Sequence, residues 1–119
     1  MEYLHRPTCS KSREGLALLQ SHADLKPFNF SVRDYKKNPL NEEEYRHLLA
    51  KFRTVDECFK IEKIIRMADL KKHGLSPCQS ESEWITLLST HPDILQRPIL
   101  SSDTKAVLGR PSQELLRLV

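Results

Sequence analysis

One cysteine stands close to the N-terminus, where an extended segment gives way to a helix. Residues 5–13 read HRPTCSKSR, and Cys9 directly precedes the residues that begin the helix. The free N–H groups and the dipole at a helix N-terminus stabilise a thiolate and lower its pKa. The same N–H groups can bind an oxyanion. Although a free cysteine is usually a small buried hydrophobe, its polar and basic surroundings here predict that Cys9 is a nucleophile.

The residues around Cys9 carry imidazole, hydroxyl and cationic groups that favour the charged thiolate. They are His5, Ser10, Lys11, Ser12 and Arg13. We expect Ser10, Lys11 and Ser12 to supply donors at the helix N-terminus and His5 to help activate the thiol; the alternative is that His5 is an ordinary strand residue. A phosphatase-type loop is excluded, because the position where such a loop carries its arginine is Gly15.

The other cysteines, Cys58 and Cys78, show no pattern of a shared site. The chain has three cysteines at irregular spacing, with no CxxC pair, and its five histidines form no HxxxH or HExxH pattern. These features argue against a disulfide framework, a dithiol redox centre and a zinc site. We therefore expect no metal and no bound cofactor, and we interpret Cys58 and Cys78 as incidental.

The charge of the chain suits a small anion better than a polyanion. The 19 basic and 16 acidic residues leave a formal net charge of +3, whereas nucleic-acid-binding proteins usually carry a clustered basic face. Arg97 and Arg110 bracket a short C-terminal segment, where they could converge on one anion. No stretch approaches the roughly 20 apolar residues that cross a bilayer, and no signal segment opens the chain. We expect a cytoplasmic monomer that binds neither nucleic acid nor membranes.

Hydrophobic periodicity predicts a strand–helix–strand unit that places Cys9 at its first junction. Residues 3–5 have the pattern of a short strand before Pro7, residues 10–22 that of a helix, and residues 28–32 that of a strand. Two strands joined through a helical crossover are expected to be parallel.

The middle of the chain shows helix signals and no strand signal. Asn41 and the three glutamates after it predict a helix start, because asparagine is a good N-cap and acidic side chains are favourable in the first turn. Further helices are expected over about 55–70, before Gly74, and over 82–90. Together they predict a helical insertion over about residues 41–90.

Two short strands and a helix are predicted at the C-terminal end. Residues 98–100 and 106–108 are apolar runs joined by SSDTK, which is typical of a hairpin, and a last helix is expected to begin near Pro111. The predicted order is therefore β-α-β, a helical insertion, and β-β-α. We expect one α/β domain of residues 1–119 with a mixed central sheet.

Two separated segments resemble the glutaredoxin-coupled arsenate reductase family. The pattern H-x-P-x-C-S-K-S-R of residues 5–13 is similar to that family's active-site segment. RPIL at 97–100 and AVLGRP at 106–111 are similar to its C-terminal signature. Both segments lie in the family's order with a helical insertion between them, so the resemblance covers nearly the whole chain. It implies a thioredoxin-like fold that contains this insertion.

The resemblance also implies a mechanism and a set of site residues. In the implied reaction the Cys9 thiolate attacks arsenate, and glutathione as co-substrate, followed by glutaredoxin, completes the two-electron reduction to arsenite. Arg97 and Arg110 match two of the three arginines that hold the anion in this family. Pro98 matches the family's cis-proline beside the active site.

The middle of the site departs from the family's pattern. Ile64-Ile65-Arg66 fits the family's Leu-Leu-Arg run only when two residues are taken as missing before Gly74. On that alignment Arg66 is the third anion-binding arginine, and otherwise it is an ordinary charge on a helix face. Arg6 stands where the family often carries asparagine.

Two other functions are open at this point. One is glutathione-dependent thiol reduction on the same scaffold, with a substrate other than arsenate. The other is a non-catalytic regulatory adaptor, because one branch of the superfamily binds RNA polymerase and senses oxidation through a disulfide. Cys9 is followed by Ser10, Lys11 and Ser12, so no CxxC switch can form, and we favour arsenate reduction.

Overall fold

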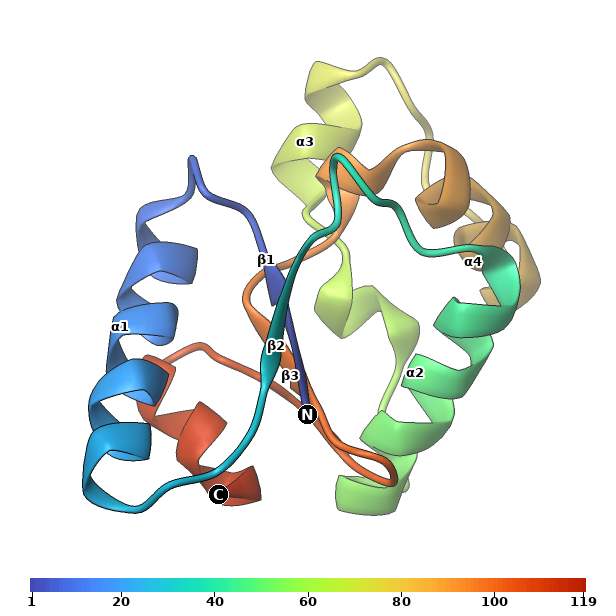
Figure 1. Ribbon diagram of the computed structural model, residues 1–119. Coiled ribbons are helices and arrows are strands. Elements are labelled where there is room, and N and C mark those ends of the chain that lie inside the picture. Colours follow the sequence, from blue (N-terminus) through green and yellow to red (C-terminus); the bar gives the residue numbers. More distant parts are fainter.

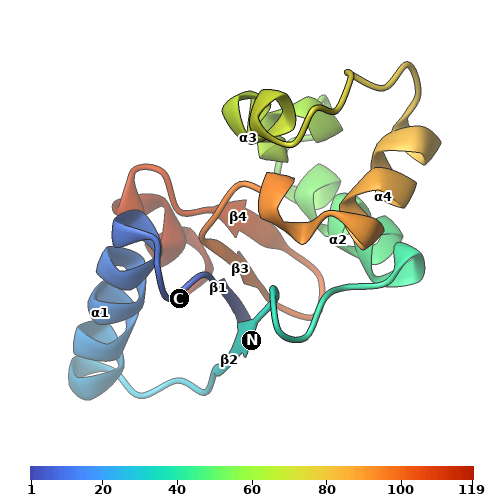
Figure 2. The ribbon, with the colours of Figure 1, turned by 90° about the horizontal axis from the view of Figure 1, so that it is seen from above.

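The central sheet places strands from both ends of the chain side by side. They are β1 (Glu2–His5), β2 (Ser31–Asp34), β3 (Ile99–Ser101) and β4 (Ala106–Leu108). The computed structural model describes all 119 residues, and its strands are ordered β2-β1-β3-β4 (Figures 1 and 2). β1 is parallel to β2 and antiparallel to β3, and β3 is antiparallel to β4. The predicted α/β class with a mixed sheet is confirmed.

Helices cover the two faces of the sheet unequally (Figure 2). They include α1 (Ser10–Leu25) and the C-terminal 3-10 helix η3 (Ser112–Leu118) on one face, and α2 (Glu42–Val55) and α4 (Glu81–Thr90) on the other. Successive strand side chains point to opposite faces of a sheet. Tyr3 accordingly belongs to the smaller core under α1 and η3, and Leu4 belongs to the larger core under α2 and α4.

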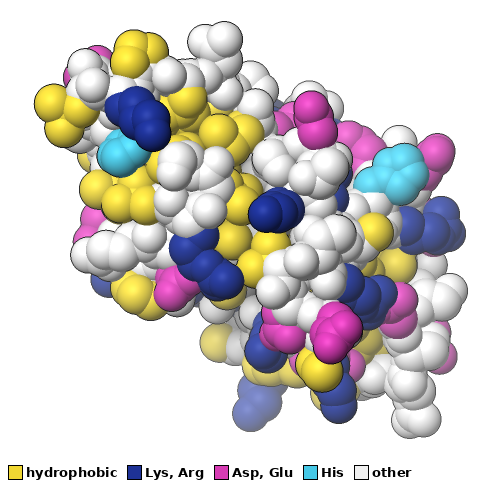
Figure 3. Space-filling model, turned by 90° about the horizontal axis from the view of Figure 1, so that it is seen from below, with side chains coloured by type: hydrophobic (Ala, Val, Ile, Leu, Met, Phe, Trp, Pro, Cys, Tyr) yellow, Lys and Arg dark blue, Asp and Glu magenta, His cyan; other side chains and the backbone are white.

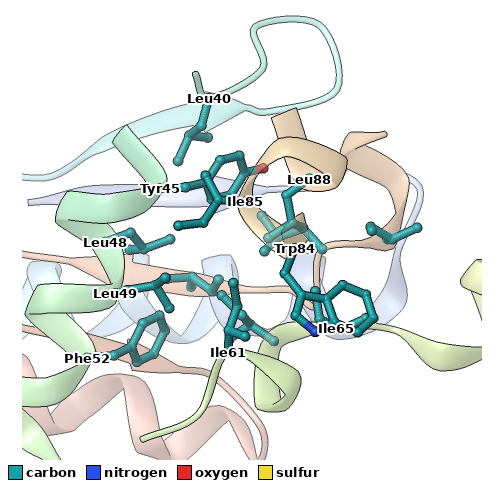
Figure 4. Packing of buried hydrophobic residues seen from close by; sticks show 14 of the residues in the cluster. Leu40, Tyr45, Leu48, Leu49, Phe52, Ile61, Ile65, Trp84, Ile85 and Leu88 are labelled. Carbon is teal, nitrogen blue, oxygen red and sulfur yellow. The ribbon is translucent and has the colours of Figure 1, made fainter. Parts of the chain in front are cut away.

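The larger core is built mainly from the facing sides of α2 and α4. Figure 4 shows the side chains that meet there: Leu40, Tyr45, Leu48, Leu49, Phe52, Ile61, Ile65, Trp84, Ile85 and Leu88. α2 begins at the predicted place. The Asn41 side chain accepts a hydrogen bond from the Glu44 N–H at 2.8 Å, and the Glu44 carboxylate accepts one from the Asn41 N–H at 3.0 Å. This reciprocal cap sets where the apolar face of α2 enters the core.

The strand predicted over residues 28–32 is wrong in its bounds. β1 begins at Glu2, whose pairing partner is Ser31, so the pairing of β2 with β1 starts only there. The rings of Phe28 and Phe30 instead stack on each other, with centroids 5.4 Å apart, and pack against the smaller core. The alternating apolar residues therefore reflect side-chain packing ahead of the strand.

The single helix predicted over residues 55–70 is also wrong. The segment after α2 instead holds the 3-10 helix η1 (Ile61–Ile64) and the short helix α3 (Met67–Lys72). Between them Ile65 forms an isolated β-bridge with Leu95, and the Arg66 N–H donates to the Ile94 carbonyl at 2.7 Å. This long-range pairing overrides the local helical preference. It also brings Arg66 beside the segment that leads into β3.

Two glycines allow α1 and the end of β4 to approach Pro98 closely. A Cβ atom at Gly15 would lie 2.6 Å from the Tyr3 hydroxyl and 3.1 Å from Pro98 Cγ. A Cβ atom at Gly109 would lie 2.8 Å from Pro98 Cγ. Larger residues would push these segments apart, so the glycines keep the start of α1 and the segment after β4 against the same proline.

In Figure 1 the N-terminal end of α1, which Cys9 caps, is the upper end of the blue helix on the left. Figure 3 views the molecule from below and so shows the end away from Cys9, where apolar side chains are interspersed with charges of both signs. None of the helices combines the length and the apolar character needed to span a bilayer.

Candidate active site

Cys9 is the N-cap residue of α1. Its backbone is extended, with φ −94° and ψ 124°, and its carbonyl accepts a hydrogen bond from the Arg13 N–H at 3.0 Å. The Cys9 N–H donates to the Arg6 carbonyl at 2.9 Å, which closes the turn between β1 and α1. The side chain makes no capping hydrogen bond and is half-buried. The sulfur is therefore held at the start of the helix.

The surroundings of Cys9 favour the thiolate. Burial by itself raises the pKa of the thiol, but the N–H groups of Ser12 and Lys11 and the guanidinium of Arg97 stabilise the charged form more strongly. The net result is a pKa below the ordinary value of a cysteine. The two N–H groups belong to the first turn of α1 and carry no intrahelical hydrogen bond of their own. Cys9 thus has the low thiol pKa expected of a nucleophile.

Two arginines from the C-terminal part of the chain meet this thiol. Arg110 Nη2 lies 3.8 Å from Cys9 Sγ, although the two residues are 101 positions apart. Arg110 Nε donates to the Arg97 carbonyl at 2.7 Å, which ties the two arginines together. The structure therefore brings Cys9, Arg97 and Arg110 into one cluster.

The Arg97 guanidinium is held by main-chain carbonyls of the preceding segment. Nη1 donates to the Asp93 carbonyl at 3.1 Å and to the Leu95 carbonyl at 3.3 Å. Asp93 lies in the short 3-10 helix η2 (Pro92–Ile94), and the Arg97 side chain is only 11% exposed. The Arg97–Pro98 peptide bond is cis, as is the bond between Arg110 and Pro111. The Arg97 guanidinium is thus placed by two main-chain carbonyls of the segment that precedes it.

His5 contacts Ser12 rather than the thiol. The His5 Nδ1 and Ser12 Oγ atoms are 2.7 Å apart, and the Arg6 N–H donates to the same hydroxyl at 2.9 Å. The Tyr3 hydroxyl donates to the Ser12 carbonyl at 2.5 Å. Burial lowers the pKa of His5, which favours the neutral ring. His5 therefore reaches Cys9 only through Ser12, whose N–H stabilises the thiolate.

The other polar residues at the start of α1 differ in what they contribute. The Lys11 ammonium is exposed and lies 3.6 Å from the Glu14 carboxylate, so it is the backbone N–H of Lys11 that acts on the thiol. Arg13 Nη1 is exposed and donates to the Pro7 carbonyl at 2.9 Å. Ser10 is exposed in the first helical turn.

Arg66 is not in contact with Cys9. It precedes α3, where its Nε lies 2.6 Å from Asp69 Oδ2 and its Nη1 lies 3.4 Å from Gln96 Oε1. The same Asp69 oxygen lies 3.7 Å from Arg97 Nη1. Arg66 is therefore linked to the Cys9 cluster through a carboxylate and through Arg97.

Two acidic residues of this region were absent from the sequence analysis. Asp69 lies three positions after Arg66, a spacing at which opposite charges on a helix often pair, so it could have been found. Asp93 lies 3.0 Å from Arg6 Nη2. No local pattern could have indicated that contact, because the two residues are far apart in the sequence and meet only in the folded chain.

Comparisons with known proteins assign the chain to a family. Residues 4–118 match the ArsC family. This chain belongs to the ArsC family. An arsenate reductase of Haemophilus influenzae is 30% identical over 124 residues, which cover 97% of this chain and 95% of the relative. An uncharacterised protein from the glnII region of Streptomyces viridochromogenes is 30% identical over 118 residues, covering 95% of this chain and 93% of that protein.

The solved structures give the fold of this ArsC-family chain. An arsenate reductase from Vibrio cholerae superimposes with a TM-score of 0.78 at 25% identity, over 100% of this chain and 98% of that one. The thioredoxin-like fold is therefore confirmed. The cluster that the fold assembles in this ArsC-family protein combines a thiolate with two guanidinium groups, which is chemically suited to binding a small oxyanion and attacking it.

Proposed function

We propose that this protein reduces arsenate to arsenite, with Cys9 as a single nucleophilic thiol. The observation that supports this most is the placement of a low-pKa thiol 3.8 Å from Arg110 in a cluster where Arg97 also acts on the sulfur. Two anions repel each other, so a thiolate can approach arsenate only when cations neutralise part of the charge. Planar guanidinium groups suit the oxygens of a tetrahedral oxyanion. Membership of the ArsC family and relatives described as arsenate reductases support the same substrate.

The proposed reaction needs two further thiols. The Cys9 thiolate attacks the arsenic atom and forms an S–As bond, and one arsenate oxygen leaves as water after protonation. Glutathione and then glutaredoxin supply the two electrons that convert As(V) to As(III), and their thiols end as a disulfide. Water then displaces the Cys9 sulfur from As(III), which breaks the S–As bond, releases arsenite and returns Cys9 to its thiolate form. Arg97 and Arg110 hold the anion and the adduct during these steps.

A second candidate is glutathione-dependent thiol reduction at the same cysteine. It is favoured by the position of Arg66, which is bound to Asp69 and does not reach Cys9. A site with two arginines at the thiol carries less positive charge than the three-arginine site of the arsenate reductases that the sequence resembles. It therefore suits a less charged substrate better.

A coupled assay distinguishes the two candidates. Glutathione, glutaredoxin, glutathione reductase and NADPH are supplied in excess, and NADPH consumption is followed with and without arsenate. Arsenate-dependent consumption that is lost in Cys9→Ser is expected for an arsenate reductase. Turnover only of small disulfides, with no response to arsenate, would assign the site to thiol reduction instead.

A further inference from the structure

A carboxylate of the protein itself lies between two of the three arginines considered above. Asp69 Oδ2 is 2.6 Å from Arg66 Nε and 3.7 Å from Arg97 Nη1. The Asp69 side chain is 18% exposed and that of Arg97 is 11% exposed, so water screens this contact only in part. One negative charge is thereby shared by two cations beside the candidate anion site.

The other partners of these two arginines are neutral. Arg66 Nη1 faces the side-chain amide of Gln96, and Arg97 Nη1 donates to two main-chain carbonyls. The nearby Asp93 carboxylate is directed elsewhere, because it pairs with Arg6 at 3.0 Å. Asp69 is therefore the one carboxylate in an ion pair with either Arg66 or Arg97.

We propose that Asp69 is an internal counter-ion of the anion site. It is a positioning residue that holds Arg66 and Arg97 in place in the free protein and competes with the bound oxyanion for the charge of Arg97. Asp69 thus limits the affinity of the site for multiply charged anions. The inference depends on the proposed function in one respect, namely that the oxyanion binds at Arg97.

The counter-ion role and a purely structural role predict opposite effects for Asp69→Asn. Asparagine keeps the shape of the side chain and one oxygen that can accept from Arg66 Nε, but it removes the charge. If Asp69 is a counter-ion, the charge released on Arg97 strengthens anion binding and stabilises the Cys9 thiolate. If Asp69 only braces the arginines, the weaker contact lets them move and both effects are reversed.

The test measures binding of inorganic phosphate, a tetrahedral oxyanion that the thiol does not reduce. Isothermal titration would compare the parent with Asp69→Asn, Asp69→Glu and Asp103→Asn. Asp103 is exposed in the turn between β3 and β4, and this turn lies at the Glu2 end of β1, away from Cys9. Asp103→Asn therefore removes the same charge far from the site.

We expect phosphate to bind Asp69→Asn about tenfold more tightly than the parent, given the Coulomb energy of charges several ångströms apart in a partly screened site. Asp69→Glu and Asp103→Asn are expected to stay within about threefold of the parent.

A second measurement needs no anion. The alkylation rate of Cys9 by iodoacetamide near pH 7 reports the thiolate fraction, and we expect it to rise about threefold in Asp69→Asn. Thermal unfolding of each variant checks that it is folded, and Asp69→Ser serves as a second charge-free variant.

The two measurements separate the failure of this inference from the failure of the proposed function. Equal or weaker phosphate binding by Asp69→Asn, with equal or slower alkylation, would overturn the counter-ion role. If the parent binds phosphate no better than Arg97→Ala does, the proposed anion site is wrong. In that case the alkylation rate still decides whether Asp69 offsets the charge that acts on Cys9.

Discussion

The two faces of the sheet are built on different principles. The core under α2 and α4 contains 19 buried hydrophobic residues, whereas the core under α1 and η3 contains five. The smaller face buries polar groups as well: Ser12 and His5 are both buried there, joined through the serine hydroxyl. Cys9 lies at the edge of this smaller face, where α1 begins, and Arg110 reaches its sulfur from the segment after β4.

This difference indicates a division of roles. Burial of apolar surface is the main favourable term in folding, so the larger face supplies most of the stability. The smaller face can then tolerate buried hydrogen bonds and close glycine contacts, both of which serve the placement of the thiol. Substitutions in the larger core should therefore lower the free energy of unfolding. Substitutions at the site on the smaller face should instead lower activity.

Cys9→Ser should have the largest effect on activity and almost none on stability. A serine hydroxyl is far less nucleophilic than a thiolate at neutral pH. Loss of a nucleophile reduces turnover by a factor on the order of 1,000 or more. The arsenate-dependent coupled assay measures the loss, and urea unfolding should show a change below about 0.5 kcal/mol. Turnover within tenfold of the parent would mean that another group is the nucleophile.

Trp84→Ala should lower stability and leave the reactivity of Cys9 unchanged. Trp84 is 2% exposed in the larger core, and truncation of such an aromatic side chain typically costs about 3–5 kcal/mol. We expect the free energy of unfolding to fall by that amount, while the alkylation rate of Cys9 in the folded protein is unchanged. Leu25→Ala is the control, because Leu25 is 87% exposed and its loss should cost less than about 0.5 kcal/mol. A large change in Cys9 reactivity without loss of stability would contradict the division of roles.

Arg97→Ala and Arg110→Ala should each lower arsenate-dependent turnover by roughly 30- to 1,000-fold. This range corresponds to about 2–4 kcal/mol for one charge-assisted contact to the reacting anion. The folded-state pKa of Cys9, which lies below the ordinary value, should rise when Arg97 is lost, so alkylation near pH 7 should also slow.

Matched variants sharpen the arginine experiment. Arg97→Lys should recover only part of the activity, because lysine keeps the charge and loses the planar pair of donors. Arg117→Ala removes an exposed arginine that pairs with Glu114, and it should stay within about twofold of the parent. Arg66→Ala tests whether Arg66 is the third anion-binding arginine. It should lower turnover as much as Arg97→Ala does only if Arg66 holds the anion. Activity of either Arg97→Ala or Arg110→Ala within a few-fold of the parent would place the anion site elsewhere.

The double variant Cys58→Ala, Cys78→Ala should have the smallest effect. Cys78 packs against the larger core, on the face of the sheet away from the site, and burial together with Glu83 raises the pKa of its thiol. Cys58 is exposed after the end of α2. A mechanism that takes its second thiol from glutathione needs neither, so turnover should stay within about threefold of the parent. Mass spectrometry after arsenate treatment shows whether Cys9 forms a disulfide with either residue. Such a disulfide would indicate that an internal cysteine, and not glutathione, supplies the second thiol.

Local sequence determined the features that depend only on neighbouring residues. Cys9 precedes a helix, and the free N–H groups of a helix start are a property of that position, so its low pKa could be predicted from a short segment. The start of α2 was likewise predictable, because the hydrogen bonds between Asn41 and Glu44 span three residues. Arg97 and Arg110 could be identified as candidates by resemblance, but their distance to the thiol could not.

Only the tertiary structure decided which distant groups meet. The helix predicted over 55–70 is interrupted where Ile65 pairs with Leu95, and that pairing places Arg66 beside Ile94, in the segment that leads into β3. The 3.8 Å contact between Arg110 and Cys9 likewise requires β1, β3 and β4 to lie together in the sheet. Hydrophobic periodicity and secondary-structure propensity reflect interactions between residues that are close in the sequence. A contact across 101 positions depends on how whole elements pack, and no local pattern contains that information.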